Sequence, residues 1–255
     1  MSEPVEGVRE LYAAVSAGDR EASADGPLAR KVTDVIHSGD AAGLTALLRE
    51  HPTLAGARIG DPQRGQSRTL LHVLTDWPGH FPDAAGKVAA LVAGGADVNA
   101  RFTGPHGETP LHWAASSDDI DALDALLDAG ADIEADGAVI AGGTPIADAV
   151  AFGQWNAARR LLERGARTNL WQAAALGLLD RVQDALVQTP PSQDDLDNAL
   201  WCAAHRGQRE TAELLLSRGA DPAWVGHDNL TTAQAAERSD AHELAVWLRE
   251  QDTKP

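Results

Sequence analysis

The residue types best suited to chemistry in this chain are a cysteine and a histidine, Cys202 and His205, in the segment NALWCAAHRG. Three positions apart on a helix, they would share one face. A thiol beside an imidazole can serve as a nucleophile and its base, if a third group orients the histidine. The neighbours of Cys202 are apolar, so the alternative is a small residue packed in the core. We favour the core interpretation and assign no catalytic residue.

Asp148 is the second candidate, because this acid stands between Ala147 and Ala149 on what should be an apolar helix face. Polar residues that break the apolar pattern are enriched at functional sites. We expect the carboxylate to form a structural bond with His112 or a nearby arginine, and such a pair would raise the pKa of His112. The sequence holds no H-E-x-x-H, paired C-x-x-C or glycine-rich phosphate loop, so no metal and no cofactor are expected.

Composition narrows the classes of partner. The net charge of −17 disfavours nucleic acid and anionic membrane, because both need clustered lysine and arginine. A basic protein partner fits that charge, as does simple solubility. A single cysteine, no apolar run of membrane-spanning length and no secretory signal predict a cytoplasmic protein. The 18 arginines against 3 lysines, with abundant alanine and glycine, are typical of GC-rich bacterial genomes.

The elements that position these residues recur along the chain. Four times along the chain, a Leu-Leu or Leu-Val pair is followed after two residues by Gly-Ala. The glycines of this pattern are Gly95, Gly130, Gly165 and Gly219, and successive glycines are 35, 35 and 54 residues apart. Two equal steps and a longer one indicate a repeat array with one degenerate repeat in the long gap. Repeats of this length, each reading as two amphipathic helices, stack into solenoids because none can bury its apolar face alone.

The sequence Thr109-Pro110-Leu111-His112 at this period resembles the ankyrin-repeat family. The resemblance implies an all-α solenoid of about seven helix–turn–helix repeats with short hairpin loops. In such a repeat the threonine caps the first helix, proline occupies its first position, and glycine ends the second helix in a left-handed conformation. The motif histidine, His72 or His112 here, is expected to bond the motif threonine and an adjoining loop.

The repeats divide the chain as follows. We expect an N-terminal helix and linker over residues 1–27, the array over 28–252 and a tail over 253–255. The repeats are expected at about residues 28–60, 66–100, 107–136, 142–169, 170–190, 197–225 and 229–252. The second departs from the family through the insertion WPGHFP at residues 77–82, whose prolines and glycine exclude helix. The fifth lacks both the Thr-Pro start and the Gly-Ala-Asp end.

Ankyrin repeats contact partners with hairpin-loop tips and the ends of first helices, on the concave side. Carried onto this sequence, the expected partner-binding residues are Phe102, His106, Val139, Ile140, Phe152, Leu176, His205, Arg206, Trp224 and His227. The middle of this set is apolar and its ends are polar or titratable, the composition of a protein interface. Trp77, in the insertion, is a further contact candidate, because an exposed loop aromatic suits that role.

The sequence therefore predicts an interaction module or adaptor that binds another protein, with a basic partner favoured by charge. The alternative is a small apolar molecule bound in an aromatic-lined concave groove, with acid–base chemistry from Asp148, His205 or His227. A purely structural or self-associating role is the third interpretation.

Overall fold

The computed structural model describes residues 21–23, 26–61 and 64–252. The chain forms two compact blocks, an N-terminal block up to Ala166 and a C-terminal block from Arg167. The described residues are mainly helical, and the helices come in the pairs that the repeats predict. Of the N-terminal helix and linker expected over residues 1–27, residues 1–20 and 24–25 lie outside the described residues.

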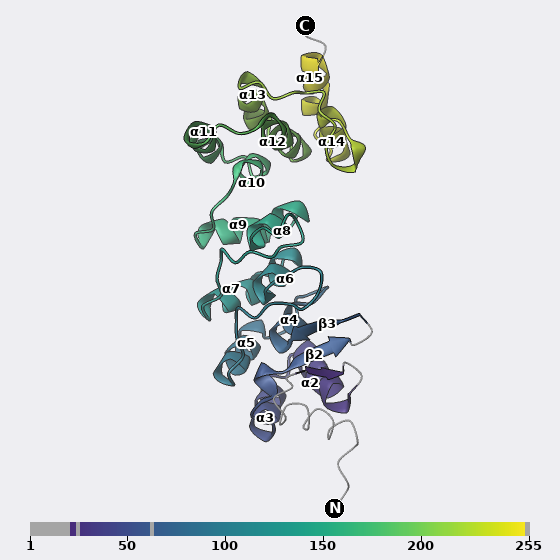
Figure 1. Cartoon of the computed structure of the whole chain (residues 1–255), viewed down its shortest axis with the longest axis vertical. Helices are drawn as coiled ribbons and strands as arrows, with labels where there is room; N and C mark the ends of the chain where they lie inside the picture. The colour runs from purple at the N-terminus through teal and green to yellow at the C-terminus, as the bar shows by residue number, and fades with distance from the viewer. Residues whose placement is uncertain (1–20, 24–25, 62–63, 253–255) are drawn as a thin grey trace, which may run out of the picture. The chain divides into compact units, whose positions relative to one another are not determined.

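The N-terminal block stacks its helices in two layers (Figure 1). The first helices of successive repeats form one layer, and each contacts the next: α2 (Pro27–Ser38), α4 (Leu70–Thr75), α6 (Pro110–Ser116) and α8 (Pro145–Ala151). The second helices form the other: α3 (Ala41–Glu50), α5 (Ala84–Ala93), α7 (Ile120–Asp128) and α9 (Trp155–Glu163). A 3₁₀ turn, η1, covers Leu54–Gly56.

Local signals in the sequence begin and end these helices as predicted. Thr69 accepts the backbone N–H of His72 at 3.4 Å, and the ring of His72 meets the Thr69 N–H in return, which closes a capping box. At the other end of a repeat, Gly130 has φ +94° and lets the Ala131 N–H reach the Leu126 carbonyl at 2.9 Å. A side chain would be strained at that φ, which explains the recurring glycine.

A three-stranded sheet at the N-terminal block is the feature that the sequence did not predict. β1 (Glu21–Ser23) pairs in parallel with β2 (Arg58–Asp61), which pairs antiparallel with β3 (Gln66–Thr69). Residues 22–23, expected in a linker, therefore belong to a strand, and α2 begins at Pro27. The strands are short and polar, so they lack the alternating apolar pattern that marks a half-buried strand.

The WPGHFP insertion connects α4 to α5 without helix, as predicted, and is fastened on both sides. Phe81 stacks on His37 at a ring distance of 4.0 Å, towards the preceding repeat. The backbone N–H of His80 donates to Asp119 at 2.6 Å, and its ring meets the Ser117 carbonyl at 3.0 Å, towards the following repeat. Trp77 at the start of the insertion is 75% exposed.

The C-terminal block has the same plan. Its helices are α10 (Leu170–Ala175), α11 (Leu179–Gln188), α12 (Gln193–His205), α13 (Arg209–Ser217), α14 (Thr232–Arg238) and α15 (His242–Asp252), with a 3₁₀ turn η2 at His227–Asn229. α12 contacts both α10 and α14. It begins at Gln193, before the expected start of that repeat, because Ser192 caps a first turn that carries Asp194 and Asp195.

Leucine and alanine side chains fill the layers between repeats. In the strongest repeat Leu123 and Leu126 are fully buried, whereas Leu127, which the sequence motif pairs with Leu126, is half-buried. Leu126 should therefore contribute more to the stability of the packed layer than Leu127 does. None of the described helices is both long and apolar enough to span a bilayer.

Candidate functional site

Two loops of the N-terminal block carry the predicted contact residues. Phe102 and His106 lie in the loop before α6, and Val139 and Ile140 lie at the tip of the loop before α8. Val139 and Ile140 are each 37% exposed, and Phe152, which follows α8, is 48% exposed. His106 is also exposed.

Contacts between the two loops hold them together. Gly137 comes so close to the first loop that an added Cβ would lie 2.3 Å from the Gly107 carbonyl oxygen. Arg101 donates to the Gly107 carbonyl at 2.9 Å and pairs with Asp136, which joins the loops through one side chain. The four predicted loop residues therefore lie on two connected loops, not on independent ones.

Phe102 differs from the expectation of an exposed interface residue. It is half-buried, with its ring 5.3 Å from Trp113 and 6.3 Å from His72. Trp113 in turn meets His72 edge-on at 4.9 Å. The three rings form one cluster between neighbouring repeats, so part of the role of Phe102 is to hold its loop in place.

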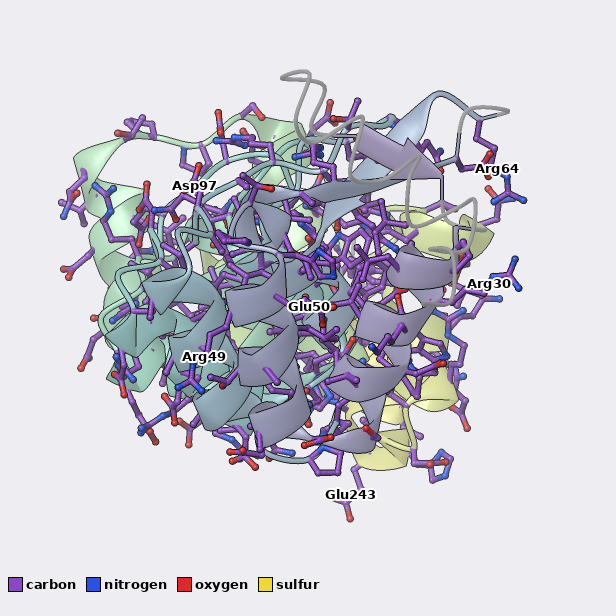
Figure 2. All side chains as sticks on the ribbon, turned by 90° about the horizontal axis from the view of Figure 1, so that it is seen from below. Arg30, Arg49, Glu50, Arg64, Asp97 and Glu243 are labelled. Carbon is purple, nitrogen blue, oxygen red and sulfur yellow. The ribbon has the colours of Figure 1, made fainter. Side chains whose placement is uncertain are left out.

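The Phe102 and Trp113 rings also line one wall of a pocket of about 280 Å³. The β2–β3 hairpin supplies the rest of the lining, including Arg64 and Arg68. Arg68 pairs with Asp76, whereas Arg64 projects outward from the hairpin (Figure 2) and lies 3.5 Å from Asp61. Sequence reasoning missed this pocket because it did not predict the hairpin; the turn glycine Gly65, at φ +62°, was the available signal.

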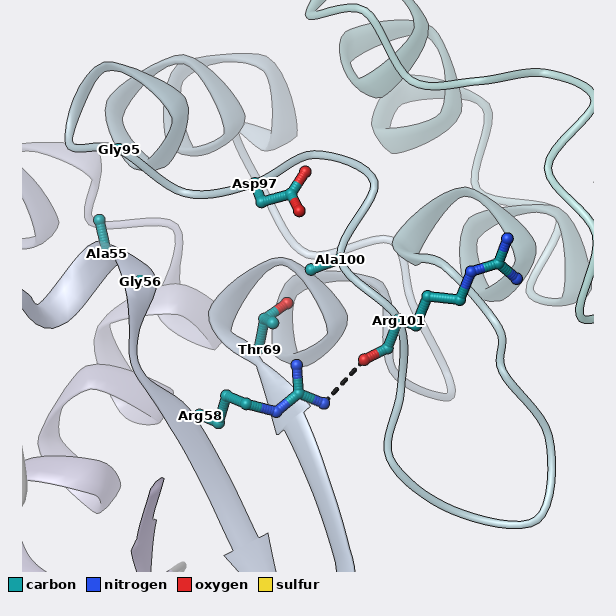
Figure 3. Close-up of a pocket in the computed structure, with 8 residues that line it drawn as sticks. All are labelled: Ala55, Gly56, Arg58, Thr69, Gly95, Asp97, Ala100 and Arg101. Carbon is teal, nitrogen blue, oxygen red and sulfur yellow. Dashed lines mark hydrogen bonds between the residues drawn. The ribbon is translucent and has the colours of Figure 1, made fainter. Parts of the chain in front are cut away.

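A second pocket of about 280 Å³ lies between η1, β3 and the loop after α5. Arg58 and Arg101 line it, but Figure 3 shows that only Arg58 lies along it, while the Arg101 side chain points away. Arg58 donates to the Arg101 carbonyl at 2.7 Å and to the Ser67 carbonyl at 2.8 Å. These bonds tie the sheet to the loop before α6, which is a structural role.

The most unusual group in the block is Asp148, in the first turn of α8 and fully buried. Within the described residues, neither carboxylate oxygen has a hydrogen-bond partner. The backbone of Ile140 and of Val139 contacts the carboxylate and lowers its pKa, which only partly offsets the effect of burial, because neither contact has full hydrogen-bond geometry. Burial, with the nearby charge of Glu108 as the next cause, raises the pKa of Asp148 to about 7.

The expected bond between Asp148 and His112 or an arginine is therefore wrong. The His112 ring instead contacts its own repeat and the next loop. Its Nδ1 accepts the Thr109 N–H at 3.1 Å, and its Nε2 lies 3.3 Å from the Gly143 carbonyl. Burial lowers the pKa of His112 to about 4, the opposite of the predicted direction. The repeat pattern identified the face on which Asp148 lies, but it could not show that the partner atoms on that face are engaged elsewhere.

Glu108 is the second acid at this place and is missing from the predicted set. It is 9% exposed, and burial raises the pKa of its carboxyl, although the hydrogen bond from Trp113 opposes that shift. Its backbone carbonyl also accepts the ring of His72 at 3.1 Å. Glu108 and Asp148 thus form two buried carboxyl groups beneath the predicted loop tips, a grouping that no local sequence motif encodes.

In the C-terminal block the predicted residues His205 and His227 meet across one tryptophan. Trp201 stacks on His205 at a ring distance of 5.1 Å and meets His227 edge-on at 4.9 Å. The Trp201 indole donates to the Leu230 carbonyl at 2.9 Å, as the motif histidines of other repeats bond the next loop. His205 also pairs with the Ser239 hydroxyl at 2.9 Å, and burial lowers its pKa.

The other predicted residues of that block are less exposed than expected. Leu176 and Arg206 at helix ends are half-buried, and so is Trp224. The Trp224 ring lies against Gly226, where an added Cβ would approach it to 2.3 Å. His227 is exposed and bonds Asn198 at 3.1 Å.

Cys202 is a core residue, as the favoured interpretation held. The thiol is buried, and burial raises its pKa to about 12. Its sulfur lies 3.8 Å from the Asn198 side-chain oxygen, while His205 turns to Ser239. A thiol with so high a pKa is a poor nucleophile. The described residues also contain no cluster of three or more side chains that could hold a metal ion.

Two family models match the repeats of this chain. Residues 83–172 match a family model described as ankyrin repeats in three copies, and residues 195–226 match a single ankyrin repeat. The human ASB11 ankyrin repeat domain is similar in structure, with 22% identity, a TM-score of 0.52, and coverage of 85% of this chain and 96% of that one. The Bcl-3 ankyrin repeat domain has 23% identity, a TM-score of 0.49 and coverage of 84% and 96%. No curated protein sequence matches significantly.

Proposed function

This chain is an ankyrin-repeat protein, and we propose that it binds another protein through the loop tips and helix ends of its repeats. Ankyrin repeats are generally protein–protein interaction modules. The observation that carries the proposal is the exposure of Val139 and Ile140, in the loop before α8, and of Phe152, directly after α8. Exposed large apolar side chains at loop tips and helix ends are typical of interaction sites.

Charge favours a partner with a basic surface. The chain carries 38 acidic against 21 basic side chains, so a basic protein is attracted over long range and approaches faster. Specific affinity would come from the apolar loop tips, because exposed charge pairs contribute little on their own.

A small apolar molecule, the alternative expected from the sequence, has little support. Arginine side chains line both pockets described above. A site for an apolar metabolite is instead lined mainly by apolar and aromatic groups, with few charges.

Capture of the partner by tagged protein tests the proposal. The wild-type chain and the variant Ile140→Glu/Phe152→Glu serve as baits, with circular dichroism to establish that both are folded. Val187→Glu is a matched control, because Val187 is 75% exposed but lies on α11, a second helix of the C-terminal block. Proteins identified by mass spectrometry are then purified and titrated directly.

We expect a partner that binds the wild type and Val187→Glu equally and loses at least about tenfold affinity for the double variant. A partner that binds all three proteins equally would contradict a role for the loop tips. The absence of any saturable protein partner would contradict the function itself.

A further inference from the structure

Asp148 is a buried acid whose charge meets only weak backbone contacts, from Val139 and Ile140. Other acids of the N-terminal block have defined partners: buried Asp119 accepts two backbone N–H groups, and Asp124 pairs with Arg160 and Arg164. Asp148 is fully buried and both its oxygens lack partners among the described residues. A buried carboxylate in that state costs several kcal/mol unless it is protonated or meets a cation.

The neighbouring charges do not stabilise an ionised Asp148. Glu108 lies near enough to disfavour the ionised form of Asp148. The cation of the two loops, Arg101, is engaged with Asp136 and the Gly107 carbonyl. His112 donates to the Gly143 carbonyl, and burial lowers its pKa to about 4, so it is neutral near pH 7. His106 is exposed and acts on Glu108.

We propose that Asp148, with Glu108 beside it, receives a lysine or arginine side chain of the partner protein, inserted beneath the Val139–Ile140 tip. The proposal rests on the proposed function and names the chemistry of its central contact. The apolar stem of such a side chain packs on the exposed tip, while its charged end reaches the carboxylates. The charge of −17 favours the approach of a basic partner.

The loop that covers Asp148 has its own internal backbone bonds. Its backbone bonds close within itself, from Gly137 to Gly142 and from Ala138 to Gly143. These bonds keep the shape of the tip, so admission of a side chain beneath it has to shift the contacts that Arg101 and His112 make with the loop. Because no third ligand of a metal-binding type lies nearby in the described residues, an organic cation fits the pair better than a metal ion.

Binding of the cation displaces the proton of the Asp148 carboxyl group. Below pH 7 Asp148 carries a proton in the free protein, so binding releases that proton to solvent and leaves an Asp148 carboxylate paired with the ammonium or guanidinium group. Affinity should therefore rise about tenfold between pH 6 and pH 8, and then level off as the free carboxyl becomes fully ionised.

The probes are two short peptides, acetyl-Gly-Arg-Gly-amide and acetyl-Gly-Lys-Gly-amide, titrated into the full chain. Citrulline and acetyl-lysine peptides are the neutral controls. Amide chemical shifts of Val139 and Ile140 report binding at the tip. We expect a saturable shift with at least one cationic peptide, none with the neutral peptides, and at least a tenfold loss of affinity in Asp148→Asn.

His106→Gln is the matched control, because this exposed histidine lies near Glu108 but does not form part of the buried acid pair. The rise in affinity from pH 6 to 8 should persist in His106→Gln and vanish in Asp148→Asn. Failure of both cationic peptides to shift the tip amides, or an equal response of Asp148→Asn, overturns the proposal.

The two proposals can fail separately. If the captured partner is lost by Ile140→Glu/Phe152→Glu but binds Asp148→Asn as tightly as wild type at pH 8, the protein-binding function stands and the cation contact is wrong. If the double variant also keeps full affinity, the loop-tip function is wrong as well.

Discussion

Replacing Asp148 with asparagine should stabilise the protein at neutral and higher pH. Asparagine keeps the shape of the protonated carboxyl group and cannot ionise. The pKa of Asp148 is raised in the folded state, from 3.8 to about 7, so the folded state binds this proton more tightly than the unfolded state. Wild-type stability from this group is therefore fully present below pH 3.8 and is lost as pH rises to about 7.

The shift sets the size of the effect. At about 1.4 kcal/mol per pKa unit, the advantage of Asp148→Asn should grow from about 1.5 kcal/mol at pH 5 to about 3 at pH 6. It should level off near 4 kcal/mol at pH 8. That plateau is a large fraction of the 5–15 kcal/mol by which a typical domain is stable.

Urea unfolding of wild type and Asp148→Asn at pH 5, 6, 7 and 8 measures the difference directly. The buried motif histidines titrate in both proteins, so their contribution cancels. Because repeat arrays can unfold in parts, hydrogen exchange of the α8 amides provides a local measure of the same quantity. Stability curves that run parallel from pH 5 to 8 would refute the reasoning, since they would mean that Asp148 is ionised and satisfied in the folded protein.

Three further predictions concern the scaffold. Leu126→Asp should cost about 3–5 kcal/mol in thermal or urea unfolding and Leu127→Asp clearly less, because only Leu126 is fully buried; equal losses would contradict the packing. His112→Ala should lower the free energy of unfolding by about 2 kcal/mol, and His112→Gln should restore part of that loss, because Gln172 and Gln234 close the same capping box on α10 and α14. Equal stability of the alanine and glutamine variants would contradict the capping role of His112. Cys202 should react with a thiol reagent at pH 8 at least about 100-fold more slowly in the folded protein than in urea, and similar rates would show that the thiol is accessible.

Much of the scaffold follows from short-range signals. Thr69 and Thr109 begin helices, and Gly95 and Gly130 end them, because each meets a local backbone requirement that its residue type satisfies. Such requirements recur at a fixed period in this chain, so a family resemblance and a helix count could be read from the sequence. The β2–β3 hairpin escaped this reading, because its strands are short and polar and owe their order to Arg58 and the loop before α6.

The candidate site depends on contacts between repeats, and these are not periodic. The sequence placed Val139 and Ile140 at a loop tip and marked Asp148 as out of pattern. It could not show that the three lie together, nor that Glu108 from the preceding repeat joins them. Whether a buried acid is satisfied depends on side chains about one repeat away, and the motif His112 that could have served it is committed to Gly143.

The WPGHFP insertion has a consequence for how the N-terminal repeats unfold. In a simple solenoid each repeat holds its neighbour only through the packed interface, so the end of the array can fray one repeat at a time. Here the insertion contacts the repeat before it, where Phe81 stacks on His37. It also contacts the repeat after it, where the His80 N–H donates to Asp119. Lys87, just beyond the insertion, adds a buried bond to the Ile36 carbonyl of the first repeat. Because these contacts join three successive repeats, we expect the three to unfold together and not one at a time.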